Sequence, residues 1–373
     1  MVDNFYSDNF EPAAKIIVIG VGGAGNNAVN RMIDEEIPNV EFYVANTDIQ
    51  ALGTSKAPNR IILGEGITGG LGAGGEPSKG KEAAEASKAQ IEEIVKDANL
   101  VFIAAGMGGG TGTGAAPVIA DIAKNVKGRE GDILVVAIVT RPFTFEGKKR
   151  IQNSIDGLNE LKSKVDSLIV VSNDKLLMND SNALIGNAFK NADSVLAQSV
   201  STVVKLICLP AIINLDFADV KNTLTKSGVG LIGYGAGSGQ NRAKEAATAA
   251  ISCPLIETGI RGARRAVVAI TCGTEVSLFE AQEAVNLLIE SAGGDIDIKF
   301  GLSINDKLTD EMFVSLIAAD FVNDVDFTAQ SNTQPIKSQE SIDLETKLSD
   351  TATREKERNF EEDSIIPDFL KSK

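Results

Sequence analysis

Histidine is absent from this sequence, and only three cysteines occur among its 373 residues. Without histidine, the chain lacks the usual general base at neutral pH and the group that activates serine and cysteine nucleophiles, and most zinc sites are excluded. Cys208, Cys253 and Cys272 show no Cys-x-x-Cys spacing, which is typical of buried, reduced cysteines in the cytosol. Any chemistry must therefore depend on carboxylates, backbone amides, a bound cation and positioning. Phosphoryl transfer is the reaction class that needs the fewest groups beyond these.

Positive charge is also scarce, since 36 Lys and Arg residues face 51 Asp and Glu residues for a net charge of −15. This balance argues against a nucleic-acid partner and against adsorption to anionic lipid. The first residues are acidic with no apolar core, and no run approaches the ~20 apolar residues of a membrane span. We therefore expect a cytoplasmic protein without direct membrane insertion, and its length leaves room for two ordinary domains.

Glycine, by contrast, is abundant and is concentrated in two loops that each follow a β-branched apolar run. Residues 15–19 lead into Gly20–Gly25, and residues 100–105 lead into Gly106–Gly114. A strand, a glycine loop and a helix in succession present backbone N–H groups and a helix N-terminus to an anion. Six glycines in nine residues of the second loop exceed the needs of a turn, so we attribute them to close backbone approach to a ligand. Two such loops predict a polyphosphate held from two sides.

Two matches to known nucleotide-binding motifs, one within the first loop and one at residues 75–82, are weaker signals. The first loop satisfies Gly-x-Gly-x-x-Gly, but Asp48 is late for the ribose-binding acid of a dinucleotide enzyme. An oxidoreductase remains an alternative, against which the second loop argues. Residues 75–82 nearly match a Walker A motif, but Glu82 stands where Ser or Thr must reach magnesium. We predict a turn and a helix start there.

Apolar runs alternate with helical patterns up to about residue 180, which predicts a parallel α/β sheet with ligands at the carboxyl ends of its strands. The expected strands are 15–20, 40–45, 60–63, 100–105, 133–139 and 167–171, and the expected helices are 26–36, 78–97, 114–126 and 147–163. A long helix over 182–208, ended by Pro210, then leads to a second α/β unit. Its expected strands are 228–234, 264–272, 295–301 and 312–319, and its helices are 240–251 and 277–291.

These patterns predict six segments along the chain. The tail is polar up to a final apolar cluster, Ile365, Ile366, Phe369 and Leu370, which is typical of a segment that binds a partner's groove. The segments are a disordered N-terminal arm (1–13), a nucleotide-binding domain (14–181), a central helix (182–209), a C-terminal α/β domain (210–321), a disordered linker (322–358) and a partner-binding peptide (359–373).

Four segments resemble the signatures of one family: 106–114, 144–150, 214–220 (a synergy loop) and 365–370. Together they are similar to the FtsZ family, the bacterial tubulin-like cell-division GTPases, over residues 14–321 and the tip of the tail. The resemblance implies a tubulin-like fold with an N-terminal Rossmann-like parallel-sheet GTPase domain, a long central helix, a smaller C-terminal α/β domain and a disordered tail. Only the connection 126–132 is longer than the family's usual one, and we expect no effect on the chemistry.

The resemblance also implies ligands, namely GTP or GDP with Mg²⁺ bound mainly through the phosphates. Asp193 and Asn173 would hydrogen-bond the guanine and Phe189 would pack on it, while Glu146 and Arg150 would lie beside the ribose. A carboxylate at 193 can accept from guanine N1–H and the 2-amino group, an arrangement that adenine does not offer. The implied phosphate contacts are Gly22, Gly23, Ala24, Gly25, Asn26, Asn27, Gly108, Gly109, Gly110, Thr111, Gly112 and Thr113, and the γ-phosphate sensor is Gly72, Ala73 and Gly74.

For hydrolysis, the resemblance implies that Asn214, Asp216 and Asp219 act on the GTP bound by the next subunit in a head-to-tail stack. Such a contact between subunits cannot close into a ring, so it extends into a filament. It further implies that filaments form the cell-division ring at mid-cell, on the inner face of the membrane. A membrane-tethering adaptor and assembly regulators would bind residues 360–373. A filament that binds nucleotide without hydrolysing it remains an alternative, although both loop carboxylates are present.

Overall fold

The computed structural model describes residues 14–37, 39–129, 131–179, 185–208, 211–253, 259–322 and 327, all within one compact unit that spans Met1–Phe327. The expected arm, terminal peptide and nearly all of the expected linker lie outside these residues, as does Pro210. Among the helices that are described, none combines the length and apolar character needed to cross a bilayer. Cys253 and Cys272 are buried and unpaired, as expected.

The N-terminal part is built on a parallel sheet in the doubly wound order of a Rossmann fold, as predicted. All of its strands lie within two residues of the expected bounds. Strands β1, β4 and β7 are buried almost throughout, because helices cover both faces. In sheet order the strands are β3 (Asn59–Ile62), β2 (Val40–Asn46), β1 (Ile16–Val21), β4 (Leu100–Gly106), β7 (Leu134–Arg141) and β8 (Ser167–Ser172).

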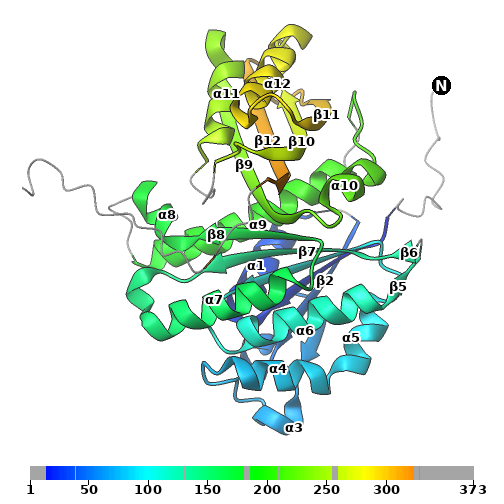
Figure 1. Cartoon of the computed structure of the whole chain (residues 1–373), viewed down its shortest axis with the longest axis vertical. Coiled ribbons are helices and arrows are strands. Elements are labelled where there is room, and N and C mark those ends of the chain that lie inside the picture. The colour runs from blue at the N-terminus through cyan, green and yellow to red at the C-terminus, as the bar shows by residue number, and fades with distance from the viewer. Residues whose placement is uncertain are drawn as a thin grey trace, which may run out of the picture. The chain divides into compact units, whose positions relative to one another are not determined.

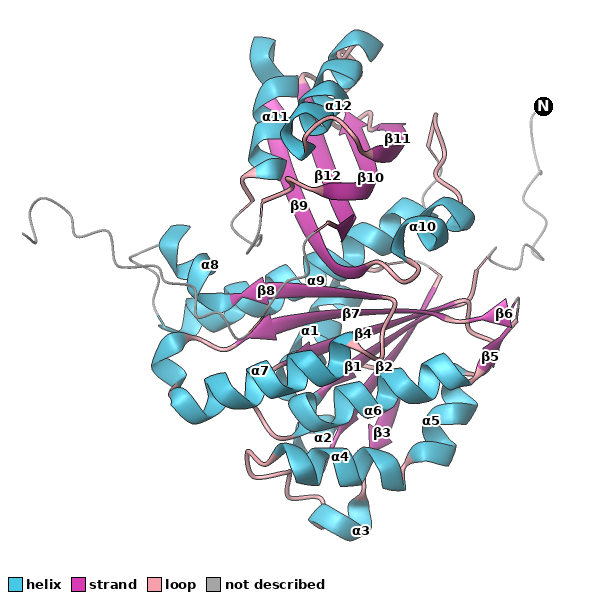
Figure 2. Ribbon diagram, viewed as in Figure 1, coloured by secondary structure: helices cyan, strands magenta, loops and turns pink. Residues whose placement is uncertain are grey.

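The helices of this part form two layers around the sheet (Figure 2). Side chains of α1 share one apolar cluster with the central helix α9 (Ile185–Cys208), and those of α4 to α7 share another on the opposite face. The helices are α1 (Gly22–Asp34), α2 (Ile49–Gly53), α3 (Glu65–Thr68), α4 (Pro77–Ala86), α5 (Lys88–Val95), α6 (Thr111–Asn125), the 3₁₀ turn η1 (Thr144–Glu146), α7 (Lys148–Lys162) and α8 (Asn173–Asn179).

One expectation in this part needs correction, and one connection contains a hairpin that the sequence did not indicate. The single helix predicted over 78–97 is two helices, because Ser87 interrupts it: its hydroxyl donates to Ala83 O (3.1 Å) and accepts from Gly64 N–H (3.0 Å). The connection 126–132 is a short antiparallel hairpin of β5 (Lys127–Gly128) and β6 (Gly131–Asp132). The helix start predicted in the Walker-like segment 75–82 is confirmed by α4.

The C-terminal part carries a mixed sheet in the order β11-β10-β12-β9. β10 and β11 run parallel and the other neighbours run antiparallel. β9 also pairs with β8 over three residues, so the two sheets are continuous. The elements are α10 (Phe217–Leu224), β9 (Gly228–Ser238), the 3₁₀ turn η2 (Gly239–Asn241), α11 (Arg242–Ile251), β10 (Ala263–Cys272), α12 (Leu278–Ala292), β11 (Asp297–Ile304) and β12 (Glu311–Phe321), as Figure 1 shows.

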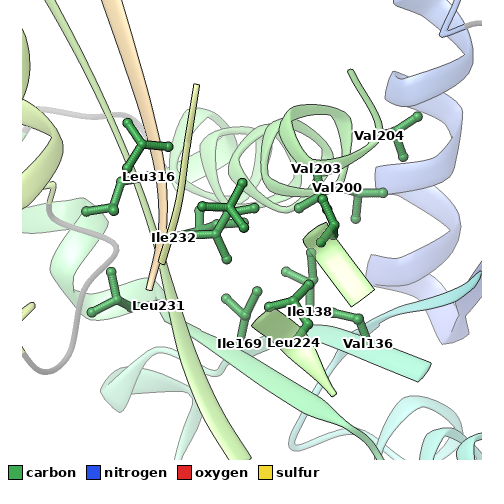
Figure 3. Packing of buried hydrophobic residues seen from close by; sticks show 14 of the residues in the cluster. Val136, Ile138, Ile169, Val200, Val203, Val204, Leu224, Leu231, Ile232 and Leu316 are labelled. Carbon is green, nitrogen blue, oxygen red and sulfur yellow. The ribbon is translucent and has the colours of Figure 1, made fainter. Parts of the chain in front are cut away.

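One apolar cluster joins the two parts through α9 (Figure 3). Burying each of these aliphatic side chains contributes roughly 1.5–3 kcal/mol, so the packing on α9 strongly favours one arrangement of the two sheets. The labelled members are Val200, Val203 and Val204 of α9, Val136 and Ile138 of β7, Ile169 of β8, Leu224 of α10, Leu231 and Ile232 of β9, and Leu316 of β12.

Candidate nucleotide-binding site

Two helix N-termini meet at the carboxyl ends of the neighbouring strands β1 and β4. Helix α1 begins at Gly22, directly after β1, and α6 begins at Thr111, shortly after β4. Neither N-cap residue, Val21 or Gly110, makes a side-chain capping hydrogen bond. The first-turn N–H groups and the positive ends of both helix dipoles are therefore suited to an anion. Residues 22–25, predicted as a loop, are in fact the first turn of α1.

A cavity of about 300 Å³ lies at these two helix ends. Its lining includes many of the predicted residues: Gly23, Ala24, Gly109, Gly110, Thr111, Gly112, Glu146, Arg150, Asn173, Phe189 and Asp193. Sequence reasoning missed Thr140, Pro142 and Ala192. Gly106 and Met107 also line the cavity; they belong to the second glycine loop but were not among the predicted phosphate contacts. Thr140 and Pro142 follow the pattern of the site, because they lie at the carboxyl end of β7, next to β4.

The other predicted residues lie just outside this lining and brace it. Asn26 is buried, and in the amide orientation that its neighbours dictate it donates to Gly20 O (3.0 Å) and Gly22 O (2.9 Å). The Thr113 hydroxyl accepts from Gly108 N–H at 2.8 Å. These two side chains hold the glycine segments in shape. Gly22, Gly25, Asn27 and the segment 72–74 are likewise not part of the lining.

Thr47 is a further residue that sequence reasoning missed. Its buried hydroxyl lies 2.6 Å from the hydroxyl of Thr111, and its carbonyl accepts from Gly72 N–H at 3.0 Å. The loop that carries Gly72–Gly74 is thereby tied to the first residue of α6. Asp48, next to it, caps α2 through Gln50 N–H and Ala51 N–H, so it is engaged within its own loop.

Most glycines of the second loop are required by the protein's own packing, which corrects the sequence-based interpretation. A Cβ at Gly112 would lie 2.5 Å from Gly106 O, and one at Gly114 would overlap the carbonyl oxygen of Pro77 in α4. No side chain fits where two backbones approach so closely. Backbone contacts of this kind explain Gly108, Gly110, Gly112 and Gly114, and at Gly106 a Cβ would lie 2.7 Å from the Cβ of Ala24. Packing therefore explains five of the six glycines.

Gly23 and Gly109 are different. A Cβ at either position would meet no protein atom within 4 Å, and neither residue has a positive φ. Both line the cavity, one from α1 and the other from the segment before α6. The space beside these two glycines is therefore available to a ligand, and they are the positions where an added side chain would obstruct it.

One end of the cavity presents hydrogen-bond acceptors on a half-buried and a buried side chain. Asp193 of α9 accepts a hydrogen bond from Asn27 Nδ2 at 3.1 Å. Burial raises the pKa of Asp193 to about 6, although the Asn27 hydrogen bond and the charge of Arg31 oppose the shift. Asn173, the first residue of α8, is 6% exposed, and its Oδ1 has no hydrogen-bond partner among the described residues. A carboxylate and an unpaired amide oxygen fit a ligand edge rich in N–H donors, as guanine is.

Aromatic rings form another wall of this end. Phe189 packs edge-to-face against Phe143 (centroids 5.1 Å apart) and Phe145 (6.4 Å). Phe143 is fully buried and stacks on Phe145, so the Phe189 ring has firm support while 41% of the residue stays exposed. Such a ring offers a surface to a planar ligand.

Glu146 and Arg150 close the side of the cavity next to η1 and α7. They form an ion pair one helical turn apart, and Glu146 Oε1 also accepts from Phe143 N–H at 2.9 Å. The carboxylate is therefore held in place at the cavity wall, within reach of a ligand hydroxyl.

Residues 214–220, which we call the acidic loop, lie at the other end of the N-terminal sheet. Asp216 caps α10 by accepting from Asp219 N–H (2.8 Å), and Asn214 Oδ1 accepts from Ala211 N–H (2.6 Å). Lys221 of α10 donates to Asp132 O, just before β7 begins. In Figure 1, α10 and the β5–β6 hairpin accordingly lie on one side of the view and α8 lies on the other.

The eight residues of β7 separate this loop from the cavity. At a rise of ~3.3 Å per residue, Leu134 and Arg141 lie roughly 23 Å apart. Asn214, Asp216 and Asp219 therefore cannot contact a ligand in the cavity of their own chain.

The fold, with a cavity at two helix N-termini, is typical of an α/β nucleotide-binding protein. Residues 15–180 match the GTPase domain of the Tubulin/FtsZ family, and residues 228–322 match the C-terminal domain of the FtsZ family. This chain belongs to the FtsZ family, and its GTPase domain makes it a GTPase that binds GTP and GDP.

Solved structures agree with this assignment. An empty FtsZ dimer from M. jannaschii is 40% identical, with a TM-score of 0.75 over 82% of this chain and 88% of that one. A mutant FtsZ from the same organism is also 40% identical, with a TM-score of 0.77 over 83% of this chain and 91% of that one. CetZ2 from Haloferax volcanii, a GTPγS-bound protofilament, shares the fold at 20% identity, with a TM-score of 0.69 over 82% of this chain and 92% of that one.

Proposed function

We propose that this GTPase polymerises head-to-tail and hydrolyses GTP at the contact between neighbouring subunits. One observation carries the proposal: the nucleotide cavity and the acidic loop lie at opposite ends of β7, roughly 23 Å apart. A single chain cannot bring them together, whereas a neighbour stacked in the same orientation can. A contact of this heterologous kind does not close, so it extends into a filament.

Exposed apolar side chains at both ends support the proposed contact. Leu71, beside the 72–74 segment, is 86% exposed, and Phe145, beside the aromatic wall, is 62% exposed. Ile212, beside Asn214, is 65% exposed. Burying such groups favours association. The FtsZ from M. jannaschii was solved as a dimer, which also supports self-association.

Within the shared site, each part of the chain has a role that its chemistry supports. Asp193 and Asn173 would accept from the guanine edge, Phe189 would pack on the base, and the first turns of α1 and α6 would bind the phosphates. Asn214, Asp216 and Asp219 of the next subunit would orient the attacking water. Mg²⁺ would neutralise phosphate charge.

In the cell, we place these filaments in the division ring at mid-cell. The protein would reach the membrane through an adaptor that binds residues 360–373, where assembly regulators would also bind. Those residues lie outside the described part of the chain, and the apolar cluster within them supports this role.

A mixing experiment tests the shared site. Asp219→Ala should bind GTP but hydrolyse it very slowly, and Thr111→Arg should block the phosphate site while leaving residues 214–220 intact. Each variant alone should be nearly inactive. Mixed, an Asp219→Ala subunit can present its GTP to the intact loop of a Thr111→Arg subunit, so part of the activity should return. No recovery at any mixing ratio would contradict a shared site.

A further inference from the structure

A buried carboxylate lies where the chain leaves α10, the helix that begins at the acidic loop. Asp166 is 2% exposed, just before β8. Its Oδ2 accepts from Lys124 Nζ (2.7 Å) and from Val135 N–H (3.0 Å), and its Oδ1 accepts from Lys226 N–H (3.3 Å). The carboxylate thus connects α6, β7 and the segment that follows α10.

The backbone of Asp166 reinforces the same connection. Its carbonyl accepts from Ser227 N–H (2.8 Å) and Gly228 N–H (3.2 Å), and its own N–H donates to Val135 O (2.8 Å). Lys226 and Gly228 both have positive φ, at 49° and 69°. A non-glycine residue rarely holds that conformation unless its surroundings impose it. The turn between α10 and β9 is therefore shaped by contacts with Asp166.

Both ends of α10 are held by packing. Leu224, at the end of the helix, is fully buried beside Ile138 and Val136 (Figure 3). At its beginning, the preceding Leu215 is buried and Ile213 exchanges backbone hydrogen bonds with Leu302 of β11. Asp216 itself is exposed, and its carboxylate accepts the local hydrogen bond from Asp219 N–H. The direction in which α10 presents the loop is therefore set from both ends, and Asp166 fixes the turn at the C-terminal end.

We infer that Asp166 is a positioning residue for hydrolysis: it fixes the turn after α10 and so holds Asp216 and Asp219 where a neighbour's nucleotide can meet them. The inference rests on the shared site proposed above. Asp166 is not part of the cavity lining, and it acts through the turn that follows α10. Lys124, its ion-pair partner, is in the last turn of α6, whose first turn lines the cavity of the same subunit.

Asp166→Asn is the informative substitution, because it keeps the size of the side chain. It removes the ion pair with Lys124 and turns one oxygen into an N–H₂ group that faces an N–H donor. Displacement of a reacting group by ~1 Å can cost up to 100-fold in rate, so we expect turnover by assembled protein to fall about 10- to 100-fold. GTP binding by the monomer should change less than about twofold, because the cavity lies at the far end of the sheet.

Ser227→Ala is the matched control. It removes a hydroxyl from the same turn but leaves the backbone contact with Asp166, so its turnover should be close to wild type. Lys124→Gln is the second variant, for use if Asp166→Asn does not fold. It removes the ion pair by changing the half-buried partner, Lys124, and should also lower turnover.

Mixing with Thr111→Arg separates positioning from general damage. Asp166→Asn should still sediment with GTP, and the mixture should recover activity as the Asp219→Ala mixture does, because the variant's nucleotide meets an intact loop. Parallel loss of GTP affinity, failure to assemble, or no recovery while Asp219→Ala recovers would each overturn the positioning role. If Asp219→Ala also shows no recovery, the shared site itself is wrong, and the role of Asp166 is wrong with it.

Discussion

We expect GTP affinity to depend on pH through Asp193, the residue proposed to accept from guanine. In the free protein, burial raises its pKa to about 6 from the ordinary 3.8. Guanine N1–H and the 2-amino group would donate to the ionised carboxylate and lower that pKa in the complex. At pH 5 only about a tenth of the free protein carries the ionised form, so GTP should bind about tenfold more weakly than at pH 7.5, a difference of about 1.4 kcal/mol.

The sign of the stability effect is opposite, which separates binding from unfolding. Because the folded state holds the Asp193 proton more tightly than the unfolded state, this group destabilises the free protein as pH rises from about 4 through about 6. Lowering the pH from 7 to 5 therefore weakens GTP binding while this residue's contribution to folding improves. A loss of GTP affinity on going from pH 7 to pH 5 therefore cannot result from unfolding caused by Asp193.

The assay is fluorescence or calorimetric titration of GTP at pH 5 to 7.5, with wild type and Asp193→Asn side by side. The nucleotide phosphates also titrate near pH ~6, so the ratio of the two dissociation constants isolates the carboxylate. Asp193→Asn should bind roughly 1–3 kcal/mol more weakly at pH 7.5, and the ratio should shrink about tenfold by pH 5. A ratio that does not change with pH would refute the reasoning, and so would equal turnover of ATP and GTP by wild type.

Three further outcomes are expected. Gly23→Ala and Gly109→Ala should each weaken GTP binding at least about tenfold and leave the melting temperature unchanged, whereas Gly114→Ala should destabilise the fold by ~1–3 kcal/mol. Wild-type GTP affinity in the first two variants would mean that no ligand occupies the space beside these glycines. The hydrogen-bonded ion pair with Arg242 lowers the pKa of Glu280 to about 2. Glu280→Gln should therefore lower the free energy of unfolding in urea by about 1–2 kcal/mol at pH 7, and this difference should fade below pH 4.5. A difference that does not change with pH would contradict this assignment. Deleting residues 360–373 should leave GTPase activity and filaments intact but abolish recruitment to the membrane, and lost GTPase activity would refute the tether.

Elements with a strong local pattern could be predicted from the sequence, and long-range contacts could not. The six strands of the N-terminal sheet follow from apolar runs, and their shared ligand edge follows from parallel order. Helix α10 was missed although signals existed: Asp216 is a good N-cap, and Phe217, Val220 and Leu224 share one face. Asp166 gave no signal, because the groups that make its carboxylate important lie 31 to 60 residues away in the sequence.

The glycine loops show how a sequence can indicate the correct site for an incomplete reason. Glycine density located the cavity, but the density arises mostly because α1, α4 and α6 approach the strands and one another within backbone contact. That close approach is what brings two helix N-termini to one cavity, so the packing glycines serve the ligand indirectly. Gly23 and Gly109 alone combine an open Cβ direction with a place in the cavity lining. Substitutions there test ligand binding, whereas substitutions at the other five glycines of the second loop test the fold.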